Sequence, residues 1–314
     1  RNKVFSRYRS YHGSTMGAGN LTGEPRRFNC ETNGVSGYIK FFDPYIYREP
    51  IEFKSEAEAT KYYLAKLREQ IIYENPETVA AIECETITGS NGCIIPPDGY
   101  LQGIRDICDE FGIMMICDEV MMGWGRTGEY FAFQNWDVKP DLVSFAKGVT
   151  CGYAPLGGVI VSKKIAEYFD DHKLLCGLTY SGHPLSCAAG VATLDVYKEE
   201  KLVENSKAMG KILGEILEEL KRKHPCVGDV RYKGLFSALE LVKDKATKEP
   251  LVEYNSDPDN TMGKIIGSLK KKGFSTYSHE NCIIVAPPLI IKEDELRAAM
   301  DIMDEVLGEV DKMI

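Results

Sequence analysis

Two apolar runs in this sequence each end on an ionisable residue, and no other feature restricts the possible fold as much. The run Ile113–Cys117 is followed by Asp118, and a second run that starts at Leu142 is followed by Lys147. Each run has the length and composition of a buried strand. Because open α/β sheets bind their ligands at the carboxyl ends of strands, the sequence predicts an α/β protein with an acid and an amine in one site.

An acid and an amine placed in this way suit pyridoxal phosphate. Lys147 would form a Schiff base with the aldehyde of the cofactor, and Asp118 would pair with its pyridinium nitrogen. Two other interpretations remain open: Lys147 as a surface lysine that ends a strand, and Asp118 as a metal-binding acid of the Walker-B type. The GxxxxGK[ST] loop that accompanies the latter does not occur in the sequence, nor does a CxxC or HxxxH metal spacing, so we expect no metal site.

Strand-like and helix-like segments alternate through the first two thirds of the chain. This pattern predicts a largely parallel sheet in a large domain, residues 1–200, followed by a small α+β domain, residues 201–314. Gly112 suits the end of one helix, and Asp98 is the predicted cap at its start. The expected strands cover residues 3–9, 79–85, 114–120, 142–146, 157–161, 227–232 and 235–242, and the main expected helices cover 55–73, 98–111 and 185–197.

Composition excludes some classes of partner. The net charge is −9 and the pI is about 5.3, which argues against a nucleic-acid surface. No apolar stretch has the length needed to span a membrane. The ten cysteines lack a paired spacing, so we expect free thiols and a cytoplasmic protein.

Seven motifs, in order along the chain, resemble the class III (omega-amino-acid) aminotransferases, which are fold type I pyridoxal phosphate enzymes. The resemblance runs from residue 3 to nearly 314, and its first and sixth motifs look most like the taurine branch of the family. The motifs are Ser10-Tyr-His-Gly, Gly89-Ser-Asn-Gly, Pro96-Pro-Asp-Gly-Tyr, Cys117-Asp-Glu-Val-Met-Met-Gly-Trp-Gly-Arg-Thr-Gly, Phe145-Ala-Lys-Gly, Thr179-Tyr-Ser-Gly-His-Pro and Ala286-Pro-Pro-Leu.

The resemblance assigns roles to residues around the cofactor ring. Lys147 would be the Schiff-base lysine and Asp118 the partner of the ring nitrogen. Val120 would pack against one face of the ring and Tyr11 would stack on the other, with His12 beside Tyr11 in the motif.

Further roles follow from the resemblance for Glu85 and Thr179. Glu85 matches an active-site glutamate at the end of a strand, although Thr86 replaces the usual proline. Thr179 matches a threonine that reaches the cofactor phosphate of the other subunit, which implies a homodimer with shared active sites. Arg126 is expected to support loop structure.

The sequence departs from the family at the positions that bind the substrate acid. Tyr277 stands where many members have a mobile arginine, and Ser90 stands near the position of its glutamate partner. The family's glycine-rich phosphate-binding segment would precede Arg1. We therefore expect these residues to bind the cofactor poorly alone, and an upstream segment to be disordered or deleted.

The resulting hypothesis is an aminotransferase that moves an amino group from an omega-amino donor, with taurine as a candidate, to a 2-oxo acid. Two alternatives remain open. One is an aminomutase or epimerase of the same fold, and the other is a non-catalytic dimeric remnant.

Overall fold

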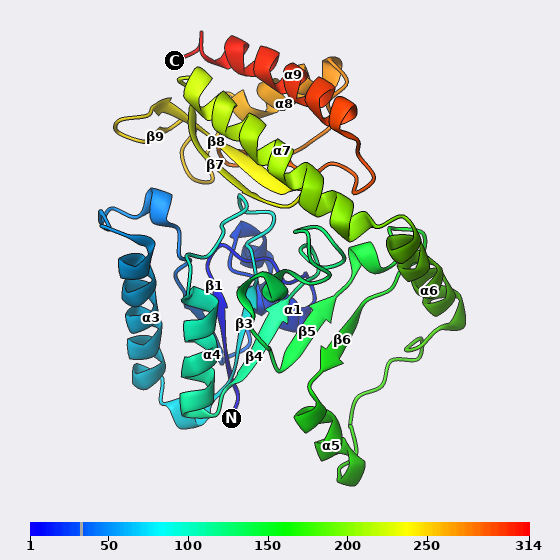
Figure 1. Cartoon of the computed structure of the whole chain (residues 1–314). Coiled ribbons are helices and arrows are strands. Elements are labelled where there is room, and N and C mark those ends of the chain that lie inside the picture. The colour runs from blue at the N-terminus through cyan, green and yellow to red at the C-terminus, as the bar shows by residue number, and fades with distance from the viewer. Residues whose placement is uncertain (32–33) are drawn as a thin grey trace.

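The computed structural model describes residues 1–31 and 34–314, which form two lobes, each built on its own sheet (Figure 1). The first sheet has the strand order β2-β1-β3-β4-β5-β6. Its first five strands run parallel, and β6 is antiparallel to β5. The expected largely parallel sheet is therefore confirmed. The strands are β1 (Lys3–Arg7), β2 (Tyr38–Phe41), β3 (Val79–Glu85), β4 (Met114–Asp118), β5 (Leu142–Phe145) and β6 (Gly158–Val161).

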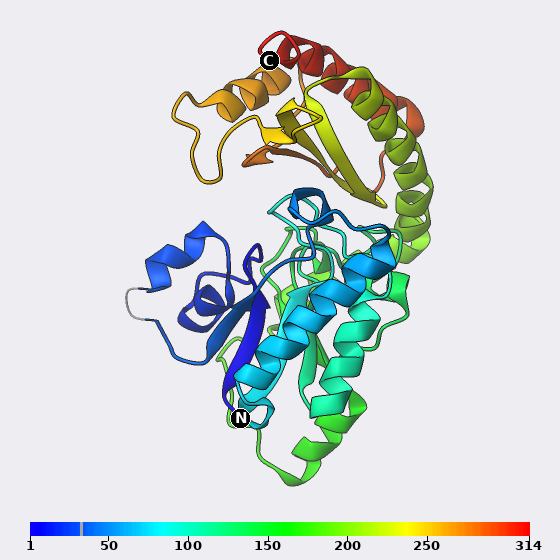
Figure 2. The ribbon, with the colours of Figure 1, turned by 90° about the vertical axis from the view of Figure 1, so that its left-hand side faces the viewer.

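Helices α3 (Glu56–Tyr73) and α4 (Tyr100–Phe111) lie side by side along one face of this sheet (Figures 1 and 2). Ser55 caps α3 by accepting a hydrogen bond from the Glu58 N–H, and every fourth residue from Ala59 to Ile71 is buried. Gly112 ends α4 in the left-handed conformation, at φ 62°, as predicted. The predicted cap Asp98 is wrong by one residue, because Gly99 occupies the N-cap position and the Asp98 carbonyl instead accepts a bond from Thr60.

The second sheet has the order β10-β11-β8-β7, with β9 paired to β8. Successive side chains of β8 point to opposite faces of the sheet. Leu239 and Leu241 join the apolar cluster of the second lobe, and Phe236 and Ala238 join that of the first lobe, so both faces of the strand are buried. The strands are β7 (Val227–Lys233), β8 (Phe236–Asp244), β9 (Glu249–Pro250), β10 (Ser278–His279) and β11 (Cys282–Val285).

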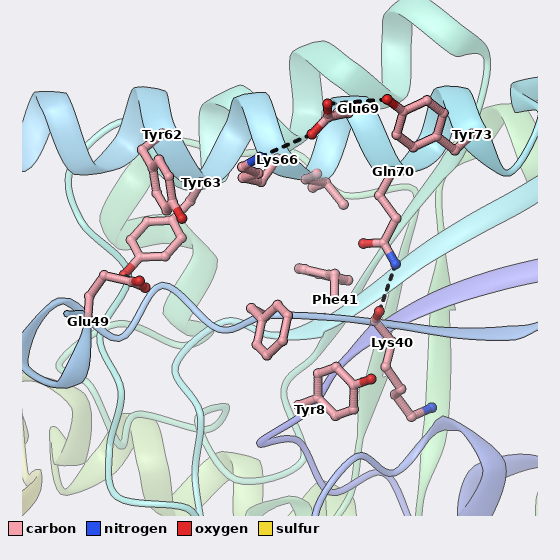
Figure 3. Close-up of a pocket in the computed structure, with 12 residues that line it drawn as sticks. Tyr8, Lys40, Phe41, Glu49, Tyr62, Tyr63, Lys66, Glu69, Gln70 and Tyr73 are labelled. Atoms are coloured by element: carbon pink, nitrogen blue, oxygen red, sulfur yellow. Dashed lines mark hydrogen bonds and ion pairs between the residues drawn. The ribbon is translucent and has the colours of Figure 1, made fainter. Parts of the chain in front are cut away.

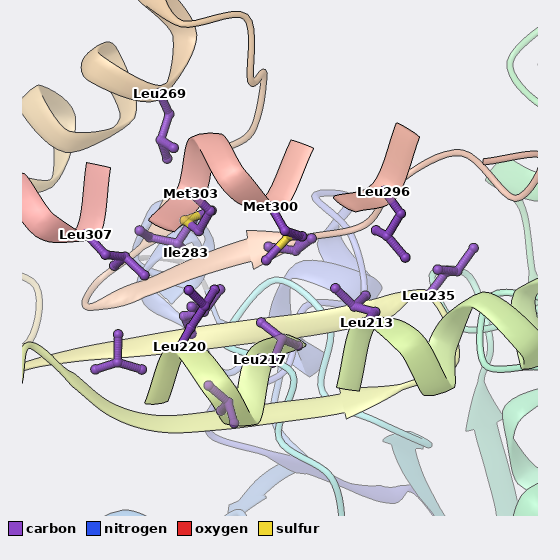
Figure 4. Packing of buried hydrophobic residues seen from close by; sticks show 14 of the residues in the cluster. Leu213, Leu217, Leu220, Leu235, Leu269, Ile283, Leu296, Met300, Met303 and Leu307 are labelled. Carbon is purple, nitrogen blue, oxygen red and sulfur yellow. The ribbon is translucent and has the colours of Figure 1, made fainter. Parts of the chain in front are cut away.

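Three helices cover the outer face of the second sheet: α7 (Leu202–Lys223), α8 (Thr261–Lys271) and α9 (Glu293–Val310). Figure 4 shows Leu213, Leu217 and Leu220 of α7 and Met300 and Met303 of α9 in the apolar layer that these helices form on the strands. The apolar stripes of α7 and α9 are therefore part of the core. We propose the turn after α6 (Pro184–Glu199), near residue 200, as the domain boundary.

The remaining helices include α1 (Met16–Leu21), α2 (Phe28–Glu31) and α5 (Lys163–Asp171), together with the 3-10 turns η1 (Pro25–Arg27) and η5 (Lys147–Val149). Within residues 1–31 and 34–314, no helix combines the length and apolar character that crossing a membrane requires.

Candidate active site

The carboxyl ends of β3, β4 and β5 bring the predicted acid and amine to one edge of the sheet. β3 ends at Glu85 and β4 ends at Asp118, and these two residues are register neighbours. Asp118 is also the register neighbour of Ser144 on β5, and Lys147 begins η5 directly after that strand. Lys147 has a φ of +42°, which is uncommon for a residue other than glycine and typical of strained functional positions.

Asp118 is buried and held in its charged form. Its Oδ2 lies 2.7 Å from Nδ1 of His12, and its Oδ1 accepts a bond of 2.9 Å from the Val120 N–H. Burial opposes ionisation, but the His12 hydrogen bond, the His12 charge and the Val120 N–H outweigh it, so the pKa of Asp118 is lowered. An acid of this kind can face a cationic ring nitrogen without taking its proton.

Lys147 is exposed at the same edge. Desolvation by the surrounding protein lowers the pKa of its amine, against the charges of Asp118 and Glu85, which favour the protonated form. A lowered pKa increases the neutral fraction of the amine, as a nucleophile and proton carrier needs.

Glu85 fixes the loop that carries Tyr11. Its Oε1 accepts a bond of 2.9 Å from the Tyr11 N–H, and its Oε2 accepts one of 2.7 Å from the Gly89 N–H. Its backbone carbonyl also accepts a bond from the buried Arg7 guanidinium. Burial raises the pKa of Glu85 to about 7.

The substitution of Thr86 for the usual proline has a structural explanation. The Thr86 hydroxyl donates a hydrogen bond to the buried carboxylate of Glu119, which also accepts bonds from the N–H groups of Ala132 (2.8 Å) and Phe133 (3.0 Å). Glu119 thus ties the loop after β4 to the end of β3. Burial raises its pKa to about 7.

Among the described residues, His12, Glu83 and Asp118 form the one group of three ligating side chains whose donor atoms all lie within 4.8 Å of one another. A metal would have to insert between them. The separation of 2.7 Å between Nδ1 of His12 and Oδ2 of Asp118 is that of a direct hydrogen bond, which fits a shared proton better than an ion.

Of the other predicted residues, three lie near Asp118 and Glu85 and one does not. Tyr11, His12 and Val120 lie around Asp118 and Glu85, as their contacts show. Thr179 does not join them: it is exposed in the connection between α5 and α6. Its contact with the cofactor phosphate of another subunit stays a prediction.

Arg126 supports structure, as expected from the sequence. Its Nη1 donates to the carbonyl oxygens of Leu235 (3.0 Å) and Pro287 (2.6 Å), so it connects the loop after β4 to the second lobe.

Sequence reasoning missed Arg26, in η1. Its guanidinium carbon lies 3.6 Å from the centre of the Tyr11 ring, and its Nη2 donates to Ser90 Oγ at 3.2 Å. The buried Glu24 carboxylate holds its Nε at 2.5 Å. No local pattern marks such a residue, because η1 is short and its contacts are distant in sequence.

A large groove of about 540 Å³ lies elsewhere, between α3 and the ends of β1 and β2 (Figure 3). Tyr8, Phe41 and Tyr73 are among its lining residues, and Gln70 donates to the Lys40 carbonyl across it. The groove contains none of the predicted site residues and lacks the pair of Asp118 and Lys147, so we do not place the predicted cofactor site there.

The chain is similar to known aminotransferases over nearly its whole length. The family model "Aminotransferase class-III" matches residues 1–307. An uncharacterized aminotransferase of Bacillus subtilis, YhxA, is 37% identical over 94% of this chain and 66% of its own. The taurine–pyruvate aminotransferase of Bilophila wadsworthia is 34% identical over 98% of this chain and 67% of its own. The chain thus spans about two thirds of the length of these curated relatives.

Among solved structures, the taurine:2-oxoglutarate aminotransferase of Bifidobacterium kashiwanohense, in complex with pyridoxal phosphate and glutamate, superimposes with a TM-score of 0.96. It is 51% identical, and the match covers 99% of this chain and 70% of that one. The chain therefore belongs to the class-III aminotransferases, and its two lobes have the fold type I α/β architecture of these pyridoxal phosphate enzymes.

Proposed function

We propose that the protein transfers an amino group from an omega-amino donor, with taurine the first candidate, to a 2-oxo acid. The observation that carries this proposal is the meeting of a lysine of lowered pKa and a buried, ionised aspartate at one sheet edge, in a chain of this family. The similarity to two taurine aminotransferases supports taurine as the donor.

The side chains at this edge fit pyridoxal phosphate. Asp118 is a hydrogen-bond acceptor kept ionised for the ring nitrogen, and Lys147 offers an amine to the aldehyde. Tyr11 is held by Glu85 with Arg26 on one face of its ring, and the other face would stack on the cofactor. When bound, the cofactor supplies a ring that accepts electrons from the carbon being deprotonated. Lys147 Nζ would take the proton from that carbon and return it, because the lowered pKa makes the neutral amine available.

The acid of the donor has a candidate partner in Arg26. The family's mobile arginine is replaced by Tyr277 and its partner by Ser90, yet Arg26 donates to Ser90, and its charge acts on both Tyr277 and Lys147. Half of the Arg26 side chain is exposed, and no hydrogen bond of its Nη1 occurs among the described residues. We infer that this guanidinium binds the sulfonate or carboxylate of the substrate.

We also propose a homodimer. Four large apolar side chains are exposed on or beside the connection between α5 and α6 that contains Thr179, and such a surface is unusual for a monomer. They are Leu175 (87% exposed), Leu178 (77%), Tyr180 (78%) and Leu185 (71%). Sedimentation of the double variant Leu175→Lys, Leu178→Lys should show a monomer if this surface joins the subunits.

We propose a cytoplasmic location. All ten cysteines, each within the described part of the chain, are free thiols, as a reducing compartment permits.

Half-reaction spectroscopy tests the function. Taurine alone should remove the visible absorbance of the bound cofactor, and pyruvate or 2-oxoglutarate should restore it. Lys147→Ala should abolish both changes, whereas the matched variant Lys163→Ala, at a side chain that is 87% exposed, should keep them.

The alternatives predict different spectra. An aminomutase or epimerase completes its turnover with one substrate, so it would not require an oxo acid to recover. A non-catalytic remnant would show no visible cofactor absorbance even when the expected upstream phosphate-binding segment is present, and that result would reject the proposed function.

A further inference from the structure

Glu83 is an acid inside the sheet that the catalytic roles above do not use. It lies two residues before Glu85 on β3, so both side chains project from the same face. Its register partner on β4 is Ile116, two residues before Asp118. Glu83 therefore lies one step behind the Glu85–Asp118 pair, on the face of the sheet that carries the site.

His12 connects the two acids. Its Nδ1 lies 2.7 Å from Oδ2 of Asp118 and 3.5 Å from Oε1 of Glu83. The side chains are 1% exposed for His12, 13% for Glu83 and 6% for Asp118. Nε2 of His12 is buried without a hydrogen-bond partner in the described part of the chain, so the contacts of the ring with these acids run through Nδ1.

Two buried carboxylates this close repel each other unless a cation stands between them. Other charged or titratable groups around the cluster are Glu85 and Cys84 on β3, Lys40 on β2, and Lys147 beyond Asp118. Burial disfavours the imidazolium, but the Asp118 hydrogen bond and the Glu83 charge outweigh this and raise the pKa of His12 to about 9. Burial also raises the pKa of Glu83, which the His12 charge opposes.

We propose that Glu83 is a positioning residue that keeps His12 as an imidazolium, so that Asp118 stays ionised and fixed in orientation at the cofactor ring. The triad Glu83–His12–Asp118 then carries a net charge of −1, which matches one protonated ring nitrogen. Only the match between the charge of the triad and the ring nitrogen rests on the proposed function. The charge state of His12 does not depend on it.

The titration of His12 in the 314-residue chain without added cofactor tests this directly. Two-dimensional NMR of the imidazole groups resolves five histidines at most, and His12→Gln identifies the signal of His12 by its loss. Glu83→Gln keeps the shape of the side chain and removes its charge. The pKa of His12 should fall by about one pH unit or more, as expected for the loss of an opposite charge at this distance.

The matched control is Glu77→Gln, which removes a carboxylate that is 82% exposed just before the same strand. It should leave the His12 titration unchanged. The signal of His224, which lies between Asp304 and Asp311 in the second lobe, reports whether each variant is folded. If Glu83→Gln does not fold, Glu83→Asp, which keeps the charge, should fold and retain the high pKa of His12.

Three results separate the possibilities. An unchanged His12 titration in folded Glu83→Gln would overturn the proposal, even if the protein transaminates. Stoichiometric Zn²⁺ binding that removes the His12 titration and is lost in Glu83→Gln would overturn it in favour of a metal site. A lowered His12 pKa, in a protein that shows no visible cofactor absorbance even with the expected upstream segment present, would support the triad while rejecting the proposed function.

Where transamination is present, a further effect should follow. The alkaline limb of the kcat/KM profile should move to lower pH in Glu83→Gln by the same amount as the His12 titration, because Asp118 then loses its charged partner sooner.

Discussion

Replacing His12 should change how the stability of the protein depends on pH. Burial lowers the pKa of His12, but the Asp118 hydrogen bond and the Glu83 charge outweigh it and raise this pKa from 6.5 to about 9. A base with a raised pKa in the folded state stabilises that state fully below pH 6.5, and this contribution is lost as the pH rises through about 9. Since each pH unit of separation corresponds to about 1.4 kcal/mol, the loss should be about 3 kcal/mol.

The comparison of wild type with His12→Gln isolates this contribution. Urea unfolding of both proteins at pH 6.5 and at pH 9.5 gives four free energies of unfolding. Glu119, whose pKa is raised to about 7, and Lys147, whose pKa is lowered, take no shift from His12, so their contributions cancel between the two proteins. The His12 charge lowers the pKa of Glu85, so this acid offsets part of the difference in the variant. The advantage of wild type over the variant should therefore shrink by at most about 3 kcal/mol between the two pH values.

If the free energies of unfolding of wild type and His12→Gln differed by the same amount at pH 6.5 and pH 9.5, the reasoning would be refuted. His12 would then be neutral at both pH values or charged at both. The exposed His172 offers a matched control at a single pH. His172→Gln should change the free energy of unfolding by less than about 0.5 kcal/mol, as is usual for surface substitutions.

Three further predictions concern the acid, the donor and the core. Asp118→Asn should lower kcat by more than about tenfold, a barrier change of about 1.4 kcal/mol, and a smaller loss would remove Asp118 as the ring-nitrogen partner. Arg26→Ala should raise KM for taurine by about tenfold or more and leave KM for a neutral amine donor unchanged. The control Arg222→Ala, on the exposed end of α7, should change neither KM. Equal increases in KM for both donors would contradict the role of Arg26. Leu217→Ala, at a fully buried position of α7, should lower the free energy of unfolding by about 2–5 kcal/mol in urea titrations, and a loss below about 1 kcal/mol would mean that this core is loosely packed.

The sequence was sufficient for the part of the site that lies on the sheet. A parallel strand buried on both faces is a nearly continuous apolar run, so an ionisable residue at its end stands out. Asp118 and Lys147 are such residues, and the strands that carry them end where predicted, to within two residues. The antiparallel pairing of β6 was not predictable in this way, because a strand pattern does not specify direction.

The rest of the site depends on contacts between segments far apart in the chain. His12 and Asp118 are 106 residues apart, and Arg26 and Ser90 are 64 apart. Glu83 looks like an ordinary interruption in a strand until the register with β4 places it behind Asp118. Such partners can be found only once the register and the course of the loops are known.

The two ends of the site carry opposite charge, and Lys147 is influenced by both. Asp118 and Glu85 favour its protonated form from the sheet edge, whereas Arg26, above Tyr11, disfavours it. A donor with an amine at one end and an acid at the other would therefore bind in one orientation, with its acid at Arg26 and its amine near Lys147. Its acid would also partly neutralise Arg26, and the loss of that positive field would raise the pKa of Lys147. The recognition of the acid and the protonation state of the amine would then be coupled through charge.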